Sequence, residues 1–118
     1  MEKVRLAEKF GLFAEHWTPK IVGQLNENNI LLAKVKGEFV WHTHEEDEMF
    51  LVVKGKLLIK LRDQDVWLDE GELFVVPKGV EHCPMADDEV HVMLVEPKIT
   101  KHTGELVTER TVNTYERI

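Results

Sequence analysis

The chain has 118 residues and a formal net charge of −7, with 43% hydrophobic and 31% charged residues. This balance is typical of a single soluble globular domain and argues against a disordered chain or a membrane protein. An acidic chain lacks the positive field that supplies most of the affinity for phosphate backbones, so nucleic acid and anionic membranes are not expected as partners.

Residues 1–19 form the first predicted element, a short helical segment. Several apolar side chains recur there at helical spacing and predict one or two amphipathic turns. These side chains are Leu6, Phe10, Phe13 and Trp17. The segment should end at Thr18, because the residue before a proline avoids the helical region.

Residues 20–98 read as a series of short strands. Apolar runs such as ILLAKV, MFLVV, KLLIKL and LFVVP are separated by turn sequences such as NENN, KGK, RDQD and PKG. This texture predicts an all-β sandwich or barrel, and the lack of helices between the strands argues against a parallel α/β sheet. The polar tail, residues 99–118, is expected to be a final strand, an arm that contacts a partner or a loosely held end.

The stretch VWHTHEEDE, residues 40–48, places two histidines immediately before a run of acids. On a strand, residues two apart face the same way, so His42 and His44 should project from one face. If the next strand pairs across the short turn, the Glu48 carboxylate should lie close to the two imidazoles. Two imidazoles and a carboxylate are the ligands of open metal sites, although paired histidines also occur on ordinary solvent-exposed faces.

Two longer segments resemble the two signature motifs of the cupin superfamily. They read GEFVWHTHEEDEMFLVVKG, from residue 37, and GELFVVPKGVEH, from residue 71. The resemblance implies a single antiparallel jelly-roll β-barrel of the cupin type, following the short N-terminal helical segment. By the same resemblance, the metal ligands are His42, His44, Glu48 and His82.

The sequence departs from the family pattern at two positions. Four residues separate Gly37 from His42 where the common pattern has five, and Ala86 stands where the second motif usually ends in asparagine. Neither change removes a ligand. Within the motifs, Gly55 and Gly71 lie where the chain reverses and are expected to need positive φ.

The resemblance implies a divalent metal ion, which would be iron, zinc, manganese or nickel, and a small-molecule substrate or ligand. The expected function is a metal-dependent enzyme of the dioxygenase or isomerase type, and small chains of this texture resemble the group described as mannose-6-phosphate isomerase-like. The alternative is a metal-bearing binding or sensory module without turnover, and a purely structural role ranks third. No catalytic acid or base is identified, and Lys78 and His91 are the only guesses.

The strand that begins at Glu48 has two faces with different expected roles. Phe50 and Val52 share the face of Glu48 and should line an apolar pocket around the ion. Met49 and Leu51 face the other way, with Trp41, and would bury against a second sheet or a second subunit. Small cupins commonly pair, so a homodimer is expected.

Three further features predict a cytoplasmic location. No apolar run approaches the roughly 20 residues that cross a bilayer, and the start MEKVRLAEKF lacks the apolar stretch of a signal peptide. The single cysteine, Cys83, excludes an intrachain disulfide and fits a reducing compartment. It is expected to be a small semi-buried side chain. A cysteine nucleophile activated by His82 is not expected, because neighbours on a strand face opposite ways.

Overall fold

The computed structural model describes residues 2–99 and 114–118, which contain one short helix and eight strands. The helix, α1, spans Leu6–Phe10. The strands are β1 (Lys20–Leu25), β2 (Asn28–Glu38), β3 (Glu48–Lys54), β4 (Leu57–Leu61), β5 (Asp65–Leu68), β6 (Leu73–Val76), β7 (His82–Pro97) and β8 (Glu116–Arg117). The expected all-β fold with a short N-terminal helix is confirmed.

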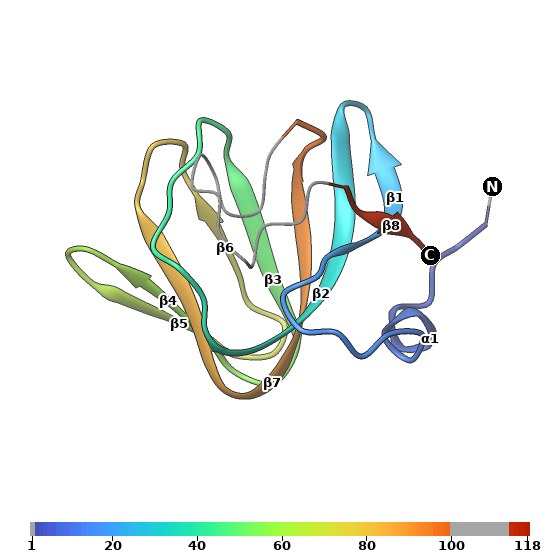
Figure 1. The fold of residues 1–118 in the computed structure, drawn as a ribbon, viewed down its shortest axis with the longest axis horizontal. Helices are drawn as coiled ribbons and strands as arrows, with labels where there is room; N and C mark the ends of the chain where they lie inside the picture. Colours follow the sequence, from blue (N-terminus) through green and yellow to red (C-terminus); the bar gives the residue numbers. More distant parts are fainter. Residues whose placement is uncertain (1, 100–113) are drawn as a thin grey trace.

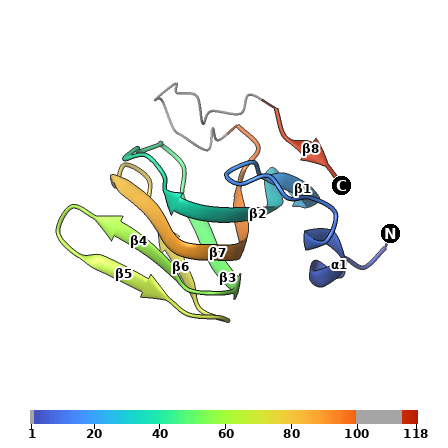
Figure 2. The same ribbon diagram turned by 60° about the horizontal axis from the view of Figure 1, so that its bottom comes forward.

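The longest strand, β7, connects the two halves of the sheet. It pairs with β2 along most of its length, with β4 through residues 82–85 and with β3 through residues 91–95. The strand β5 continues the sheet beyond β4, and β6 continues it beyond β3. One half of the sheet contains β4 and β5, the other contains β3 and β6, and both halves are joined to β7. The two halves curl toward each other (Figures 1 and 2). These pairs are antiparallel, whereas β8 lies parallel to β1.

The core lies on the concave side of this curled sheet and is made by alternate residues of the strands. In β7, Val90, Val92 and Leu94 are buried while the residues between them are half-buried, because successive side chains point to opposite faces. The same alternation in β3 buries Phe50 and Val52. The two residues therefore face the core, as the sequence predicted.

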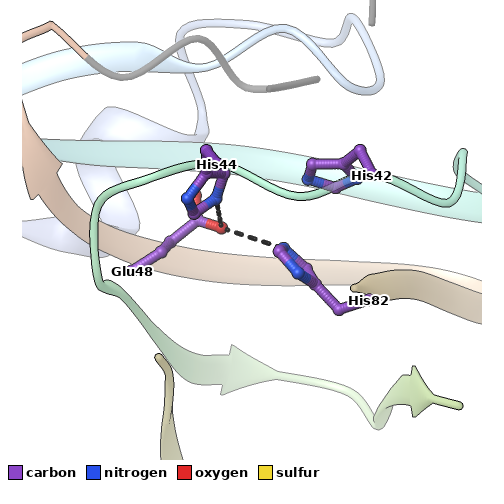
Figure 3. A group of neighbouring side chains, drawn as sticks. All are labelled: His42, His44, Glu48 and His82. Atoms are coloured by element: carbon purple, nitrogen blue, oxygen red, sulfur yellow. Dashed lines mark hydrogen bonds and ion pairs between the residues drawn. The ribbon is translucent and has the colours of Figure 1, made fainter. Parts of the chain in front are cut away.

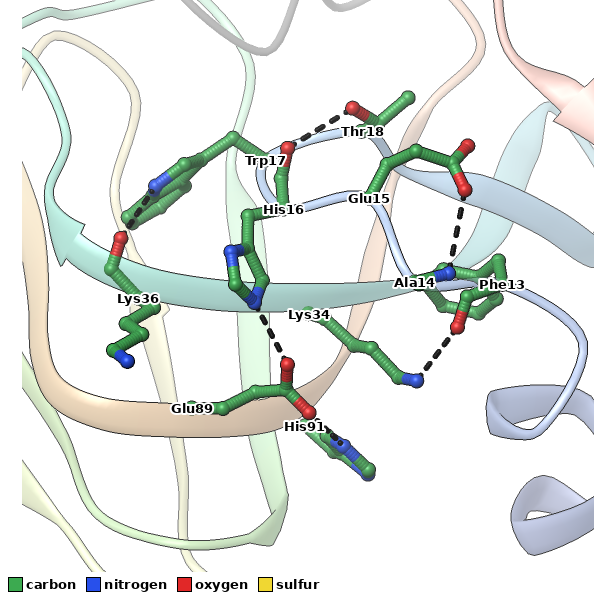
Figure 4. Close-up of polar contacts among 10 residues, drawn as sticks. All are labelled: Phe13, Ala14, Glu15, His16, Trp17, Thr18, Lys34, Lys36, Glu89 and His91. Atoms are coloured by element: carbon green, nitrogen blue, oxygen red, sulfur yellow. Dashed lines mark hydrogen bonds and ion pairs between the residues drawn. The ribbon is translucent and has the colours of Figure 1, made fainter.

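The N-terminal segment is less helical than its apolar spacing predicted. The helix makes one turn and its cap is Gly11, so Phe13 and Trp17 lie outside it. Trp17 has a φ of 58°, in the left-handed region that a bulky residue rarely occupies. It is held there by two hydrogen bonds. Its backbone N–H donates to the Lys34 carbonyl (2.9 Å), and its indole Nε1–H donates to the Lys36 carbonyl (2.9 Å), as Figure 4 shows. Tertiary contacts with β2 therefore replace the helix after Gly11.

The expected positive φ is found at both turn glycines. The φ angle is 96° at Gly55 and 82° at Gly71. At Gly55 a Cβ atom would also lie 3.1 Å from Cγ2 of Val90. Glycine is therefore required at Gly55 by both backbone conformation and space.

The predicted C-terminal tail, residues 99–118, lies mostly outside the described residues. The part that is described, residue 99 and residues 114–118, includes β8, which pairs with the first two residues of β1. Within the described ranges, no helix is long and apolar enough to cross a membrane.

Candidate metal centre

The two histidine motifs meet through a short backbone contact rather than through a regular strand. Residues 39–47, between β2 and β3, contain only an isolated bridge between His42 and His82. The backbone N–H of each of these residues donates to the carbonyl of the other, at 3.1 and 3.0 Å. The expectation that His42 and His44 share a regular strand was therefore wrong, but the bridge places His42 directly beside His82.

Four side chains from the two motifs converge inside the curled sheet (Figure 3). Glu48, the first residue of β3, has its Oε1 3.3 Å from Nε2 of His44 and 3.6 Å from Nε2 of His82. One nitrogen or oxygen from each of His42, His44, Glu48 and His82 lies within 4.8 Å of the others. All four side chains are buried. The structure thus brings together every residue that the sequence nominated as a ligand.

The backbone fixes which nitrogen of each imidazole points into the centre. Nδ1 of His42, His44 and His82 lies 2.9, 2.7 and 2.8 Å from the carbonyl oxygens of Val40, Glu46 and Val80 respectively. A carbonyl oxygen only accepts, so each Nδ1 carries a hydrogen and donates it. In a neutral ring the lone pair is then on Nε2, which is the arrangement of a metal-binding histidine.

Two ring nitrogens at the centre have no donor to satisfy them in the described part of the chain. Nε2 of His42 and Nε2 of His82 are buried and have no hydrogen-bond partner among the described residues. A divalent cation would satisfy them together with His44 and Glu48. Ligand atoms 2.0–2.2 Å from one ion lie at most about 4.4 Å apart, which is close to the 4.8 Å that spans this set. These donors therefore fit a metal ion.

Burial and charge act on the histidines in different directions. Burial, with a smaller effect of the neighbouring His82, lowers the pKa of His42 to about 4. Burial also lowers the pKa of His44, but the hydrogen bond and negative charge of Glu48 outweigh it and raise that pKa above its ordinary value. In the metal-free protein His44 therefore takes up a proton before His42 does.

Glu96 is a buried carboxyl group next to the centre that the sequence analysis missed. Burial and the charge of Glu48 raise the pKa of Glu96 well above its ordinary value. Burial acts in the same direction on Glu48, but hydrogen bonding with Glu96 and His44, together with the nearby His82 ring, holds the pKa of Glu48 well below its usual range. Of these two carboxyl groups, Glu96 therefore takes up a proton first. Its position in the sequence could have indicated this burial, because Glu96 lies two residues after the buried Leu94 and residues two apart on a strand face the same way.

An apolar cavity adjoins the centre. Its polar lining residues are His42 and Glu48, and Phe50 lines it as the sequence predicted. The other lining residues are Trp17, Pro19, Ala33, Val35, Phe39, Leu57, Pro84, Val92 and Leu94. Val52 is buried in the core but does not line the cavity.

The two guesses for a catalytic acid or base do not lie in this cavity. Lys78 is exposed, and its backbone N–H donates to Asp47 at 2.9 Å. His91 faces the outer side of β7, where its ring stacks on Phe10 with 4.5 Å between centroids. Cys83 is buried, and burial raises the pKa of its thiol. The described residues thus provide no general acid or base in the cavity apart from the four clustered side chains and Glu96 beside them.

The predicted outward direction of Trp41 agrees with its contacts. The guanidinium carbon of Arg62 lies 3.8 Å from the centre of the Trp41 ring. Lys60 also lies near this ring, with its Nζ 5.9 Å from the centre. Two cations therefore cover the Trp41 ring outside the cavity.

Residues 30–108 match the family model described as Cupin domain. A cupin-2 domain containing protein from Shewanella frigidimarina has a solved structure that is 47% identical, with a TM-score of 0.80. That match covers 80% of this chain and 94% of the other protein.

Two curated proteins give shorter matches. Uncharacterized protein YdbB of Bacillus subtilis is 35% identical over 63 residues, which cover 52% of this chain and 56% of that protein. Acireductone dioxygenase of Phaeosphaeria nodorum is 27% identical over 93 residues, which cover 70% of this chain and 50% of that protein. The chain spans about half the length of these curated relatives.

Proposed function

The chain belongs to the cupin domain family, and from this premise we propose that it is a metal-dependent dioxygenase acting on a small organic molecule. The observation that carries the proposal is the convergence of three imidazoles and one carboxylate oxygen in a buried space where two of the ring nitrogens have no hydrogen-bond partner among the described residues. A divalent ion held there would supply a Lewis acid or redox centre with one or two positions left for substrate and dioxygen.

The residues of this chain have separate roles in the proposal. His42, His44 and His82 hold the ion through Nε2, and their Nδ1 hydrogen bonds to the backbone keep the rings oriented. Glu48 supplies the negative ligand, and Glu96 positions its carboxylate. The apolar lining keeps bulk water away from the reacting atoms.

Elemental analysis tests the metal site directly. Untagged protein purified without chelator is expected to contain close to one divalent ion per chain, with iron the metal that the dioxygenase proposal requires. Zinc, nickel or manganese as the only functional ion would contradict oxygen chemistry based on iron. Failure to take up any ion, even after reconstitution, would contradict the metal site itself.

Oxygen consumption tests the reaction type. The name of the acireductone dioxygenase relative favours oxygen chemistry over isomerisation, so iron-loaded protein is expected to consume dioxygen when given small enols. His44→Ala, treated with the same iron, is the control and should consume no more than free iron. Substrate conversion without oxygen uptake would favour an isomerase instead.

A metal-bearing binding module is the second candidate function. It is favoured by the lack of a further acid, base or cation among the described residues that line the cavity. Such a module would bind small ligands at the metal and leave them unchanged. Tight ligand binding by the iron-loaded protein, without oxygen uptake or product, would support this function over the enzyme.

A further inference from the structure

We propose that the cavity beside the metal centre takes a small molecule with an uncharged, apolar body, bound to the ion through oxygen, and that Trp17 is a residue that determines this specificity. The inference rests on the proposed metal site and adds the class of ligand. It excludes ligands that carry a phosphate or a second carboxylate into the cavity.

The composition of the cavity wall favours a ligand with an apolar body. Ten of the twelve lining residues are apolar, and the other two, His42 and Glu48, belong to the proposed metal site. Among residues 2–99 and 114–118, no lysine, arginine, amide or hydroxyl side chain lines the cavity. The body of a ligand would therefore meet only apolar groups once its metal-binding oxygen atoms are placed.

The cations on the neighbouring strands have other partners. Nζ of Lys34 donates to the Phe13 carbonyl at 2.6 Å, and Nζ of Lys20 donates to the Glu15 carboxylate at 2.7 Å. Neither side chain lines the cavity. A negative group on the body of the ligand would therefore be buried without a compensating charge.

The charge at the ion limits the charge of the ligand. A divalent ion held by the Glu48 carboxylate and three imidazoles would carry one net positive charge, since a ligating carboxylate is anionic and a ligating imidazole is neutral. One anionic oxygen of a ligand neutralises this charge. A ligand with a single ionised metal-binding group thus fits, and a second negative charge does not.

The size of the cavity limits the body of the ligand. About 40 Å³ is available to the centre of a water molecule, and one water needs roughly 10–15 Å³ on this measure. The space beside the ion therefore accepts a group of only a few heavy atoms, such as a short alkyl chain.

Trp17 forms part of the wall from outside the matched family segment, which begins at residue 30. Its ring stacks on Phe39, with centroids 4.5 Å apart. Beside it, Nε2 of His16 lies 2.7 Å from a carboxylate oxygen of Glu89 and ties this segment to β7 (Figure 4). The N-terminal segment thus places one rigid aromatic side chain against the ligand space.

A pair of hydroxamates tests the ligand class. Butanohydroxamate and succinic monohydroxamate bind metals through the same two oxygen atoms and differ only at the far end, which is a methyl group in one and a carboxylate in the other. Each is titrated into the full-length protein loaded with one Co²⁺ per chain, and binding is followed by the visible absorption of the cobalt. Affinity for free Co²⁺ corrects for any difference between the two metal-binding groups.

Butanohydroxamate is expected to bind at least tenfold more tightly than succinic monohydroxamate. Trp17→Ala should weaken binding of butanohydroxamate at least fivefold, and Trp17→Phe should weaken it less. Trp17→Phe also keeps a ring in the wall and covers the case in which the alanine variant fails to fold. Trp67→Ala is the matched control, because Trp67 is half exposed and does not line this cavity.

The outcomes separate the two proposals. Protein that takes up no Co²⁺ would contradict the metal site and the ligand class together. Cobalt-loaded protein that binds the carboxylated hydroxamate equally well or better, or binds neither, would overturn the ligand class and leave the metal site standing. Unchanged affinity in both Trp17 variants would show that Trp17 does not determine which ligand binds.

Discussion

Single hydrogen bonds decide the chemistry of the candidate metal centre. Each of its three histidines donates Nδ1–H to a backbone carbonyl only two residues away, so the orientation of the ring is set by local backbone. One ring nitrogen of each histidine lies within 4.8 Å of the others and of a Glu48 carboxylate oxygen, and Nε2 of His42 and of His82 has no partner among the described residues. Buried acceptors of this kind are costly unless a cation joins them. The residues thus favour metal binding before any relative is considered.

His44→Ala is expected to abolish stoichiometric metal binding. It removes one of four ligands and the partner of Glu48, so affinity should fall by about 100-fold or more. Metal content after dialysis against a weak chelator measures the change. His91→Ala is the matched control, since His91 lies on the outer face of β7 and should retain the ion. Full metal retention by the His44 variant would remove His44 from the ligand set.

Metal affinity should fall as the pH is lowered, because protons compete for Nε2. Glu48 raises the pKa of His44 above its ordinary value of 6.5, so a proton held between these groups must leave before metal binds. The decline is therefore expected to begin above pH 6.5, with about tenfold loss per pH unit below the pKa of His44. His42 takes up a proton, and so competes with the metal ion, only near its pKa of about 4.

Competition with a chelator of known protonation, at pH values from about 5.5 to 8.5, measures this dependence. The sign follows from the raised pKa, since the folded metal-free protein holds the His44 proton more tightly than an ordinary imidazole does. Equal affinity at both ends of the range would show that no histidine proton competes with the ion.

At the scale of elements, the curvature of β7 builds the site. His82 and Glu96 lie 14 residues apart on one strand, which would separate them by about 46 Å if the strand were straight. Both nevertheless interact with the carboxyl group of Glu48. The strand must therefore bend around the core, as Figures 1 and 2 show. The turn at Gly55, which packs on Val90 of β7, lies where this bend requires close approach.

Gly55→Ala is expected to destabilise the protein more than Gly71→Ala. Both residues have positive φ, which costs an alanine about 1 kcal/mol. At Gly55 the added Cβ also lies 3.1 Å from Val90, and overpacking adds about 1–3 kcal/mol. At Gly71 nothing lies within 4 Å of the added atom. Urea unfolding midpoints compare the variants, and equal loss in both would show that the Val90 contact relaxes freely.

At the scale of the whole molecule, one outer face of the sheet carries apolar side chains. Leu73 and Val75 of β6 are 56% and 46% exposed, and they pair in register with the half-buried Leu51 and Met49 of β3. Met93 of β7 continues this row beside Leu51. The homodimer expected from the sequence stays a prediction, and we propose that a second copy of the chain covers this face.

Light scattering during size-exclusion chromatography tests the dimer. The chain mass is 13.7 kDa, so the protein should elute with twice this mass. Replacing both Leu73 and Val75 with glutamate should give a folded monomer, because a charged pair cannot be buried against its own copy. A monomeric wild type, or a dimer unaffected by the double change, would exclude this interface.

The sequence by itself determined the all-β class, the turn glycines and the identity of the four clustered side chains. Period-two alternation sets the facing of Phe50 and Val52, and the resemblance of the two motifs to the cupin motifs implies His42, His44, Glu48 and His82 as ligands. The narrower likeness to mannose-6-phosphate isomerases, the cytoplasmic location and the identity of the metal stay predictions.

Only the tertiary structure decided which other side chains reach the centre. The bend of β7 brings Glu96 to Glu48, and contacts with β2 pull Trp17 out of the helical spacing and into the cavity wall. The same packing leaves Lys78 and His91 outside. Sequence spacing cannot show these outcomes, because they depend on contacts between segments far apart in the chain, where packing overrides local preference.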